Sequence, residues 1–358
     1  MATLSQTPAN LPAASAPRPA SALQTAFAPI VLDGLTHNYG DRLALDHLSF
    51  EVRAGEIFGL LGPNGSGKTT LFRILSTLMT PTGGNASIQG FNVACEPNKV
   101  RQQIGIVFQA RSVDLKLTVA ENLKHQGNLY GLSGARLKSL IDDVLGRIGL
   151  LDRKGDFVET LSGGMQRRVE LAKGLIHSPS VLLLDEPSTG LDPGARRDLW
   201  QYLETLRDEE NVAILVTTHL MEEAEHCDRL AILNEGKLVA LGSPFDLKSQ
   251  IGGDVVLFEV HDPEAAKTLA TRLLQRFGVA AETFENLVRL EQEQGHRFVA
   301  SVVEAFPGIV ESVSVSKPSL EDVFIRRTGH RFWTEVPSND PRSGLTTTGR
   351  TTNVRKGA

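Results

Sequence analysis

The sequence predicts an α/β fold, in which a mixed sheet is covered by helices and is followed by a small α+β unit. Short apolar runs alternate with helical patterns over residues 29–248. Three of these runs, EIFGLLG, VLLLDEP and VAILVTTH, are too continuously apolar for a half-exposed sheet, which is typical of buried strands. Over residues 254–329 the order becomes strand, helix, two strands, helix and strand, as in a ferredoxin-like unit, with one more helix after it.

The elements of the large unit follow from these patterns in chain order. Paired strands are predicted at 30–39 and 44–52, and a buried strand at 56–62 leads into the helix at 68–79. A strand at 104–109, a helical stretch at 118–149 and strands at 181–187 and 212–219 complete it. In the small unit we expect strands and helices in the order 254–260, 263–277, 280–285, 286–291, 296–306, 309–316 and 319–329.

Both ends of the chain read as disordered tails. Residues 1–28 are rich in Ala, Pro and Ser, and they lack the basic start and apolar block of a secretory signal. Residues 334–358 are polar without periodicity.

Composition limits the partners. The net charge of -5 argues against nucleic acid, because phosphate binding depends on clustered Lys and Arg. The 2 cysteines, Cys95 and Cys227, are too far apart to suggest a zinc site or a disulfide framework. No apolar run reaches the roughly 18 residues that span a bilayer, so we expect a partner to provide any link to a membrane.

The stretch LLGPNGSGKTT carries the first motif. Its residues 62–69 match G-x-x-x-x-G-K-[ST], in which backbone N–H groups and a helix start surround phosphate oxygens. Lys68 would reach the β- and γ-phosphates, and the Thr69 hydroxyl would bind Mg²⁺. The alternative is a glycine-rich turn without a ligand, which the buried strand before it and the helix after it disfavour. The predicted nucleotide-binding residues here are Gly62, Pro63, Asn64, Gly65, Ser66, Gly67, Lys68, Thr69 and Thr70.

VLLLDEP, residues 181–187, ends a buried strand in two carboxylates. We expect Asp185 to hold Mg²⁺ through water, and Glu186 to act as the base that polarises an attacking water. Alone, two adjacent acids could equally well cap the end of the strand.

LSGGMQ, residues 161–166, distinguishes this chain from most proteins with a glycine loop. Ser162, Gly163 and Gly164 begin a helix and form a second anion-binding helix end. Because the first loop already surrounds its own phosphate, we expect these residues to read the γ-phosphate that a second chain holds.

With these three motifs, residues 30–245 resemble an ATP-binding cassette (ABC) ATPase. The resemblance implies a P-loop NTPase cassette, with a helical subdomain at about 111–160 that meets a transmembrane partner. It implies Mg²⁺ and water contacts for Gln109, and a dimer-interface position for Asp192 in STGLD.

The same resemblance gives His219 a contact to the γ-phosphate and Tyr39 a stacking contact with adenine. Each has a plainer alternative. Gln109 could be an ordinary polar residue at a strand end, His219 a surface or helix-cap residue, and Tyr39 an aromatic residue that packs on its hairpin.

RSVDLKLTVAENLKHQGNLYGL resembles exporter ATPases with a separate permease, and KPSLEDVFIRRTG resembles the end of the daunorubicin-resistance type. The resemblance implies a homodimer that hydrolyses two ATP at the cytoplasmic face of a membrane, for example in drug or lipid efflux. Three alternatives stay open: a soluble ABC ATPase of the ribosome, one that acts on DNA, and a regulatory protein without turnover. The single cassette, the short spacing between motifs and the presence of Glu186 respectively disfavour them.

Overall fold

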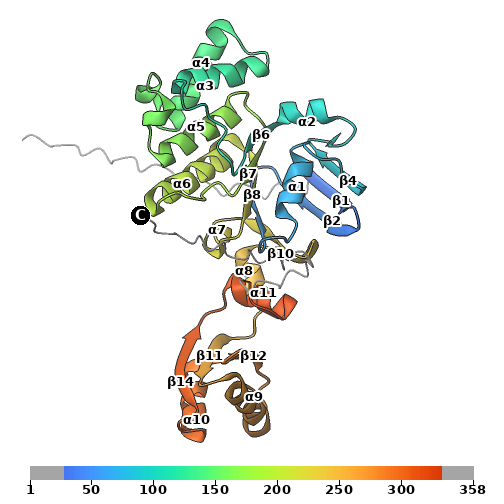
Figure 1. Cartoon of the computed structure of the whole chain (residues 1–358), viewed down its shortest axis with the longest axis vertical. Coiled ribbons are helices and arrows are strands. Elements are labelled where there is room, and N and C mark those ends of the chain that lie inside the picture. Colours follow the sequence, from blue (N-terminus) through green and yellow to red (C-terminus); the bar gives the residue numbers. More distant parts are fainter. Residues whose placement is uncertain (1–27, 333–358) are drawn as a thin grey trace, which may run out of the picture.

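The computed structural model describes residues 28–332, and the two predicted tails lie outside this range except for Ala28. The molecule is elongated, with a large α/β unit at one end of its long axis and a small sheet with two helices at the other (Figure 1). Within the described range, no helix is both long enough and apolar enough to cross a bilayer.

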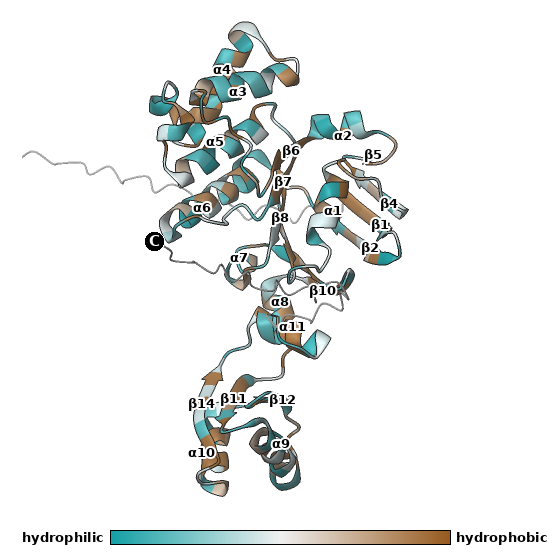
Figure 2. Ribbon diagram, viewed as in Figure 1, coloured by the Kyte–Doolittle hydropathy of each residue, from teal (hydrophilic) through white to brown (hydrophobic). Residues whose placement is uncertain are grey.

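A six-stranded sheet forms the centre of the large unit, in the order β10-β9-β3-β8-β7-β6. Strands β9, β3, β8, β7 and β6 are parallel, and β10 pairs antiparallel to β9 at one edge. Every residue of β3, β7 and β8 is buried, because both faces are covered, and these strands are among the most apolar parts of the ribbon in Figure 2. The strands are β3 (Ile57–Leu61), β6 (Ile104–Val107), β7 (Val181–Asp185), β8 (Ala213–Thr218), β9 (Arg229–Asn234) and β10 (Lys237–Gly242).

One face of this sheet packs against a second, antiparallel sheet and the helix α1. The second sheet has the order β2-β1-β4-β5. Alternate residues of the central strands, such as Phe58, Leu183 and Leu215, join the apolar cluster between the two sheets. The elements are β1 (Ile30–Tyr39), β2 (Arg42–Val52), α1 (Lys68–Leu75), β4 (Gly83–Ile88), β5 (Phe91–Asn92) and, beside them, α2 (Pro97–Gln103).

The other face packs against α5 (Gly163–Leu175) and α6 (Pro193–Glu210), through intervening residues such as Ile57, Leu182 and Ile214. Two further helices, α3 (Val119–Leu129) and α4 (Gly134–Arg147), pack on α5. The sequence predicts one helical stretch at 118–149. It divides because Gly131 and Gly134 adopt φ of 75° and 64°, a backbone conformation that ends or precedes a helix. Two short 3₁₀ turns, Leu151–Arg153 and Val158–Thr160, lead on to α5.

The small sheet has the order β12-β13-β11-β14 and is antiparallel throughout. Its element order, β-α-β-β-α-β, is that of a ferredoxin-like unit. Helices α9 and α10 cover one face and enclose a separate apolar cluster around Phe258. The elements are β11 (Asp254–Val260), α9 (Pro263–Phe277), β12 (Glu282–Phe284), β13 (Leu287–Gln292), α10 (Gly295–Ala305) and β14 (Val310–Ser316).

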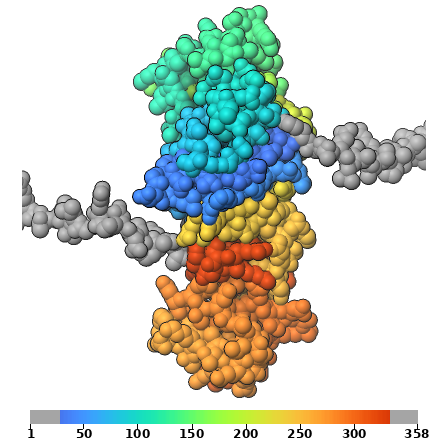
Figure 3. All heavy atoms as spheres, turned by 90° about the vertical axis from the view of Figure 1, so that its right-hand side faces the viewer, coloured from blue at the N-terminus to red at the C-terminus, as the bar shows by residue number. Residues whose placement is uncertain are grey.

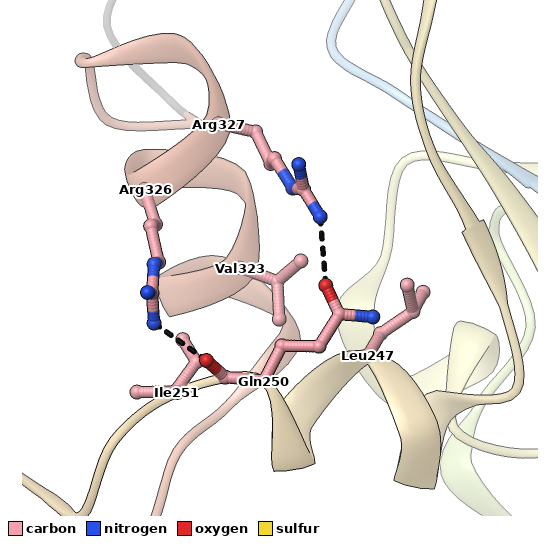
Figure 4. A pocket seen from close by; sticks show the side chains of 6 residues that line it. All are labelled: Leu247, Gln250, Ile251, Val323, Arg326 and Arg327. Carbon is pink, nitrogen blue, oxygen red and sulfur yellow. Dashed lines mark hydrogen bonds between the residues drawn. The ribbon is translucent and has the colours of Figure 1, made fainter.

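The last helix, α11 (Leu320–Thr328), lies between the two units (Figure 3). Its apolar side packs with α8 (Pro244–Ser249) and β10, and Val255 of β11 joins the same apolar cluster, so α11 contacts both units. Figure 4 shows Arg326 and Arg327 of α11 reaching Gln250, with hydrogen bonds of 2.6 Å to its backbone oxygen and 2.7 Å to its side-chain oxygen. The short helix α7 (Met221–Ala224) follows β8.

Candidate nucleotide-binding site

A cavity of about 620 Å³ opens at the carboxyl ends of the parallel strands, where ligands bind in open α/β sheets. The glycine loop follows β3, Glu186 follows β7, and His219 follows β8. The β1–β2 hairpin and the β9–β10 turn close the other side. Its lining residues are Tyr39, Arg42, Leu43, Ala44, Asn64, Gly65, Gly67, Lys68, Thr69, Thr70, Gln109, Glu186, Thr189, His219 and Glu235.

The glycine loop has little room for side chains. Gly67 has φ of 105°, and a Cβ there would lie 2.8 Å from the backbone oxygen of Ala44. The loop turns directly into α1, whose N-terminus therefore points at the cavity. The loop is therefore suited to bind a phosphate group through its backbone N–H groups.

Lys68 is 5% exposed, and its ammonium donates to the backbone oxygens of Gly62 (2.6 Å) and Pro63 (3.0 Å). An ammonium has three donors, so one remains for a phosphate oxygen. Burial lowers the pKa of Lys68, while the nearby carboxylates of Glu186 and Asp185 raise it.

Asp185 ends β7 and is 8% exposed. Burial raises the pKa of its carboxyl group, and the hydrogen bond that it accepts from Thr217 Oγ1 at 2.6 Å acts in the opposite direction. Asp185 directly precedes Glu186 but is absent from the cavity lining.

Glu186 stands at the centre of a hydrogen-bonded cluster. Gln109 Nε2 donates to Glu186 Oε2 at 3.0 Å, and His219 Nδ1 lies 2.9 Å from Oε1. The Glu186 backbone has φ of 45°, a costly conformation for a residue other than glycine. It is held there because its N–H donates to both the backbone oxygen and Oγ1 of Thr217.

Tyr39 forms part of the opposite wall, at the end of β1. Its side chain is in the exposed class at 44%, and its hydroxyl lies 3.5 Å from Thr70 Oγ1. Its ring contacts His37 edge-on, with a centroid distance of 4.8 Å. Part of the ring is therefore free to stack on a planar group in the cavity.

The signature segment forms a second, separate cluster at the starts of α5 and α6. Ser162 caps α5 by accepting from Met165 N, and Asp192 caps α6 by accepting from the N–H groups of Gly194 and Ala195. A Cβ on Gly164 would lie 2.8 Å from that of Ala195, so the two helix starts are adjacent. Ser162, Gly163 and Asp192 are exposed, and none of them lines the cavity.

Ten of the residues that the sequence singles out thus line one cavity. Gly62, Pro63 and Ser66 lie in the same loop without lining it. Five lining residues were not predicted: Arg42, Leu43, Ala44, Thr189 and Glu235. Thr189 lies within STGLD, which could have revealed it, whereas Glu235 lies in a turn with no motif.

The fold and the site define a P-loop nucleoside-triphosphatase. The sequence model of the ABC transporter family matches residues 45–189. The daunorubicin/doxorubicin resistance ATP-binding protein DrrA of Streptomyces peucetius is 36% identical over 84% of this chain and 92% of its own. A Nod factor export ATP-binding protein I of Neorhizobium galegae is 40% identical over 85% and 86% of the two chains.

Solved structures agree. A cassette that forms part of the ABC transporter complex cbiONQ of Clostridium perfringens is 26% identical, with a TM-score of 0.58 over 70% of this chain and 96% of that one. A dimeric ATP-binding cassette bound to ADP and Pi is 28% identical, with a TM-score of 0.54 over 60% and 98% of the two chains. The chain belongs to the ABC transporter ATP-binding proteins, and it is an ATPase.

Proposed function

We propose that two copies of the chain bind and hydrolyse two ATP at their interface and thereby drive a separate transmembrane permease that exports its substrate. The observation that carries this proposal is the position of Glu186 at the cavity wall, with Gln109 on one carboxylate oxygen and His219 on the other.

In hydrolysis, Glu186 accepts a proton from a water whose oxygen attacks the γ-phosphorus. The bond from that phosphorus to the bridging oxygen breaks, and the products are ADP and inorganic phosphate. Gln109 orients the water, and His219 donates to a γ-phosphate oxygen. Lys68 neutralises charge on the β- and γ-phosphates, and Tyr39 stacks on adenine.

The residues present fit a bound Mg²⁺. Thr69, in the first turn of α1, lines the cavity and offers a hydroxyl, and Gln109 offers an amide oxygen there. Asp185 offers a carboxylate at the end of β7. Oxygen ligands of this kind, completed by waters and phosphate oxygens, are those that Mg²⁺ prefers. When bound, the ion would neutralise charge on the phosphates.

The exposed signature cluster supports the homodimer. Ser162, Gly163 and Gly164 cannot complete their own chain's cavity, whose lining excludes them, but their helix N-terminus suits an anion. Each copy would offer this end to the partner's γ-phosphate, with Asp192 beside it. The dimeric state of a related cassette bound to ADP and Pi favours the same arrangement.

The exporter role and a peripheral position at the cytoplasmic face of a membrane rest on relatives named for drug resistance and Nod factor export. Drugs or lipids are the cargoes that we propose for this chain. The alternative is a soluble ABC ATPase that acts on ribosomes or DNA.

The deciding experiment is a gentle-detergent pull-down of the tagged Glu186→Gln chain from its native membranes, with ATP present to hold the dimer closed. We expect a polytopic membrane protein to copurify. Recovery with ribosomes or DNA, or in the soluble fraction alone, would reject the transport role and leave the ATPase intact. In parallel, Lys68→Ala should weaken ATP binding, and unchanged affinity would count against the assigned loop.

A further inference from the structure

A buried ion pair lies on α5, one turn beyond the signature residues. Arg167 Nη1 donates to Glu170 Oε2 at 2.5 Å, and the two residues are 8% and 3% exposed. Neither lines the nucleotide cavity. Burying two charges costs free energy unless their remaining hydrogen-bonding groups are satisfied.

Arg167 binds two backbone oxygens that flank the proposed catalytic residues. Its Nε donates to Pro187 O at 2.8 Å, and its Nη1 donates to Phe108 O at 2.7 Å. Pro187 directly follows Glu186, and Phe108 directly precedes Gln109. A single guanidinium therefore holds together the two chain segments whose side chains meet at 3.0 Å in the cavity wall.

Glu170 joins α5 to the segment that follows Gln109. Its Oε1 accepts from the backbone N–H of Ser112 at 2.6 Å. One turn earlier on α5, Gln166 Oε1 accepts from Arg111 Nη1 at 2.9 Å. Phe108, Arg111 and Ser112 are thus each joined to α5.

We propose that Arg167 and Glu170 are positioning residues for ATP hydrolysis: they set the spacing of Gln109 and Glu186 and fix both to the helix that begins at Ser162. The proposal rests on the proposed function, because it assigns the pair to that same site. The same contacts make α5 and residues 108–112 move as one body. A displacement of the segment after Gln109 then also displaces Ser162 at the start of α5.

The geometry of guanidinium explains why the residue is Arg. Its planar fork donates in several fixed directions at once, whereas the ammonium of Lys is a point donor on a flexible stem. Lys at 167 would keep the charge opposite Glu170 but could not hold both flanking carbonyls in their present places. Arg167→Lys therefore separates the positioning role from simple loss of a buried charge.

The test measures steady-state ATP hydrolysis by the full-length Arg167→Lys chain. We expect kcat to fall about 10- to 100-fold, because small misplacements of catalytic groups have effects of this size. KM for ATP should stay within about twofold, since Lys68 and the glycine loop are untouched. A second variant, Glu170→Gln, should lower kcat in the same direction without changing KM, and it serves if Arg167→Lys fails to fold.

The matched control is Arg229→Met. Arg229 begins β9 and pairs at 3.1 Å with the buried Glu56, which precedes β3, at the end of the sheet away from the nucleotide cavity. Its loss removes a comparable ion pair and should leave kcat unchanged even if it lowers the melting temperature. A fall in kcat equal to that of Arg167→Lys would show that only general destabilisation is at work and would overturn the proposal.

A double-variant cycle distinguishes a positioning role from a merely structural one, because it measures whether the effects of the two substitutions on the hydrolysis rate are additive. In the Glu186→Gln background, Arg167→Lys should reduce the residual rate much less than it does in the wild type, because it acts through Glu186. Full additivity, or unchanged kcat in both folded variants, would reject the proposal. If the wild-type chain itself fails to hydrolyse ATP, it is the proposed function that fails.

Discussion

Gln109 and Glu186 stand 77 positions apart in the sequence, yet their side chains meet at 3.0 Å in the wall of the nucleotide cavity. Their strands explain the meeting: β6 and β7 are parallel neighbours, so the residues that follow them emerge at the same edge of the sheet. In this structure Glu186 is thus already oriented by a hydrogen bond on each carboxylate oxygen.

The first prediction concerns Glu186 as the base. Glu186→Gln keeps the size of the side chain but cannot accept the proton of the attacking water. We expect kcat for ATP hydrolysis to fall by at least about 100-fold, the size of a typical general-base contribution, with ATP affinity retained. Hydrolysis and equilibrium ATP binding would be measured on the same preparation.

Glu222→Gln is the control, because Glu222 lies nearby on α7 with its side chain 90% exposed. It should hydrolyse ATP at the wild-type rate. Substantial turnover by Glu186→Gln would mean that another group takes the proton.

The second prediction concerns the pH dependence of the Mg²⁺ site. Thr217 Oγ1 donates to Asp185 and thereby lowers a pKa that burial raises. Thr217→Val removes the donor at nearly constant shape, so the pKa of Asp185 should rise further. It also removes one acceptor of the Glu186 N–H, which keeps its hydrogen bond to the backbone oxygen of Thr217. At a given acidic pH more of the carboxyl group is then protonated and unable to bind Mg²⁺, so the acid limb of the activity profile should move to higher pH.

The rate of hydrolysis would be measured as a function of pH at saturating ATP, for Thr217→Val and for Thr217→Ser. Because Ser retains the hydroxyl, its acid limb should coincide with that of the wild type. An acid limb that stays in place in the Val variant would exclude Asp185 as the titrating group.

The third prediction concerns adenine. If Tyr39 stacks on the base, Tyr39→Ala should lose about 1–3 kcal/mol of binding, which is roughly 5- to 150-fold in affinity. Tyr39→Phe should bind nearly as well, because it keeps the ring and loses only the long hydroxyl contacts to Thr70 and Met79. Titration with a fluorescent ATP analogue would compare the three chains, and equal affinities would return Tyr39 to a packing role.

The sequence predicts those parts of the fold and the site whose residues lie within one short stretch of chain. The glycine loop and the strand ends at Asp185 and His219 follow from apolar runs joined to polar residues, because a buried parallel strand and the loop after it lie in one stretch of chain. The helix α6 was not predicted, although Asp192 and Pro193 supply a capping residue and a first-turn proline.

Contacts between distant segments could not be predicted in the same way. Arg167 reads as one more charge on a helix, and only the fold shows that it donates to Phe108 O, 59 residues away. Glu235 joins the cavity because the β9–β10 turn folds beside the β1–β2 hairpin, where a Cβ on Gly236 would lie 2.7 Å from Ala44 O. The role of the exposed starts of α5 and α6 could not be predicted from local patterns either, since their proposed ligand is held by another chain.

The last prediction concerns how the small sheet is attached to α11. Arg289 of β13 is 3% exposed, and it donates to Asp322 of α11, which also completes the capping box at Ser319. Glu282 and Glu291 supply further carboxylates to the same guanidinium. Arg289→Met removes the cation opposite the Asp322 carboxylate and puts an apolar side chain there. The free energy that holds the small sheet to α11 should therefore fall by about 3 kcal/mol.

Native-state hydrogen exchange would detect this weakening as faster exchange of the β13 and α11 amides. Arg297→Met is the control, because Arg297 is exposed on α10 and should leave those amides unchanged. The rate of ATP hydrolysis should be the same in both variants, since neither residue touches the cavity. Unchanged exchange in Arg289→Met would mean that apolar packing of α11 against Val255 of β11, and not the ion network, holds the small sheet to α11.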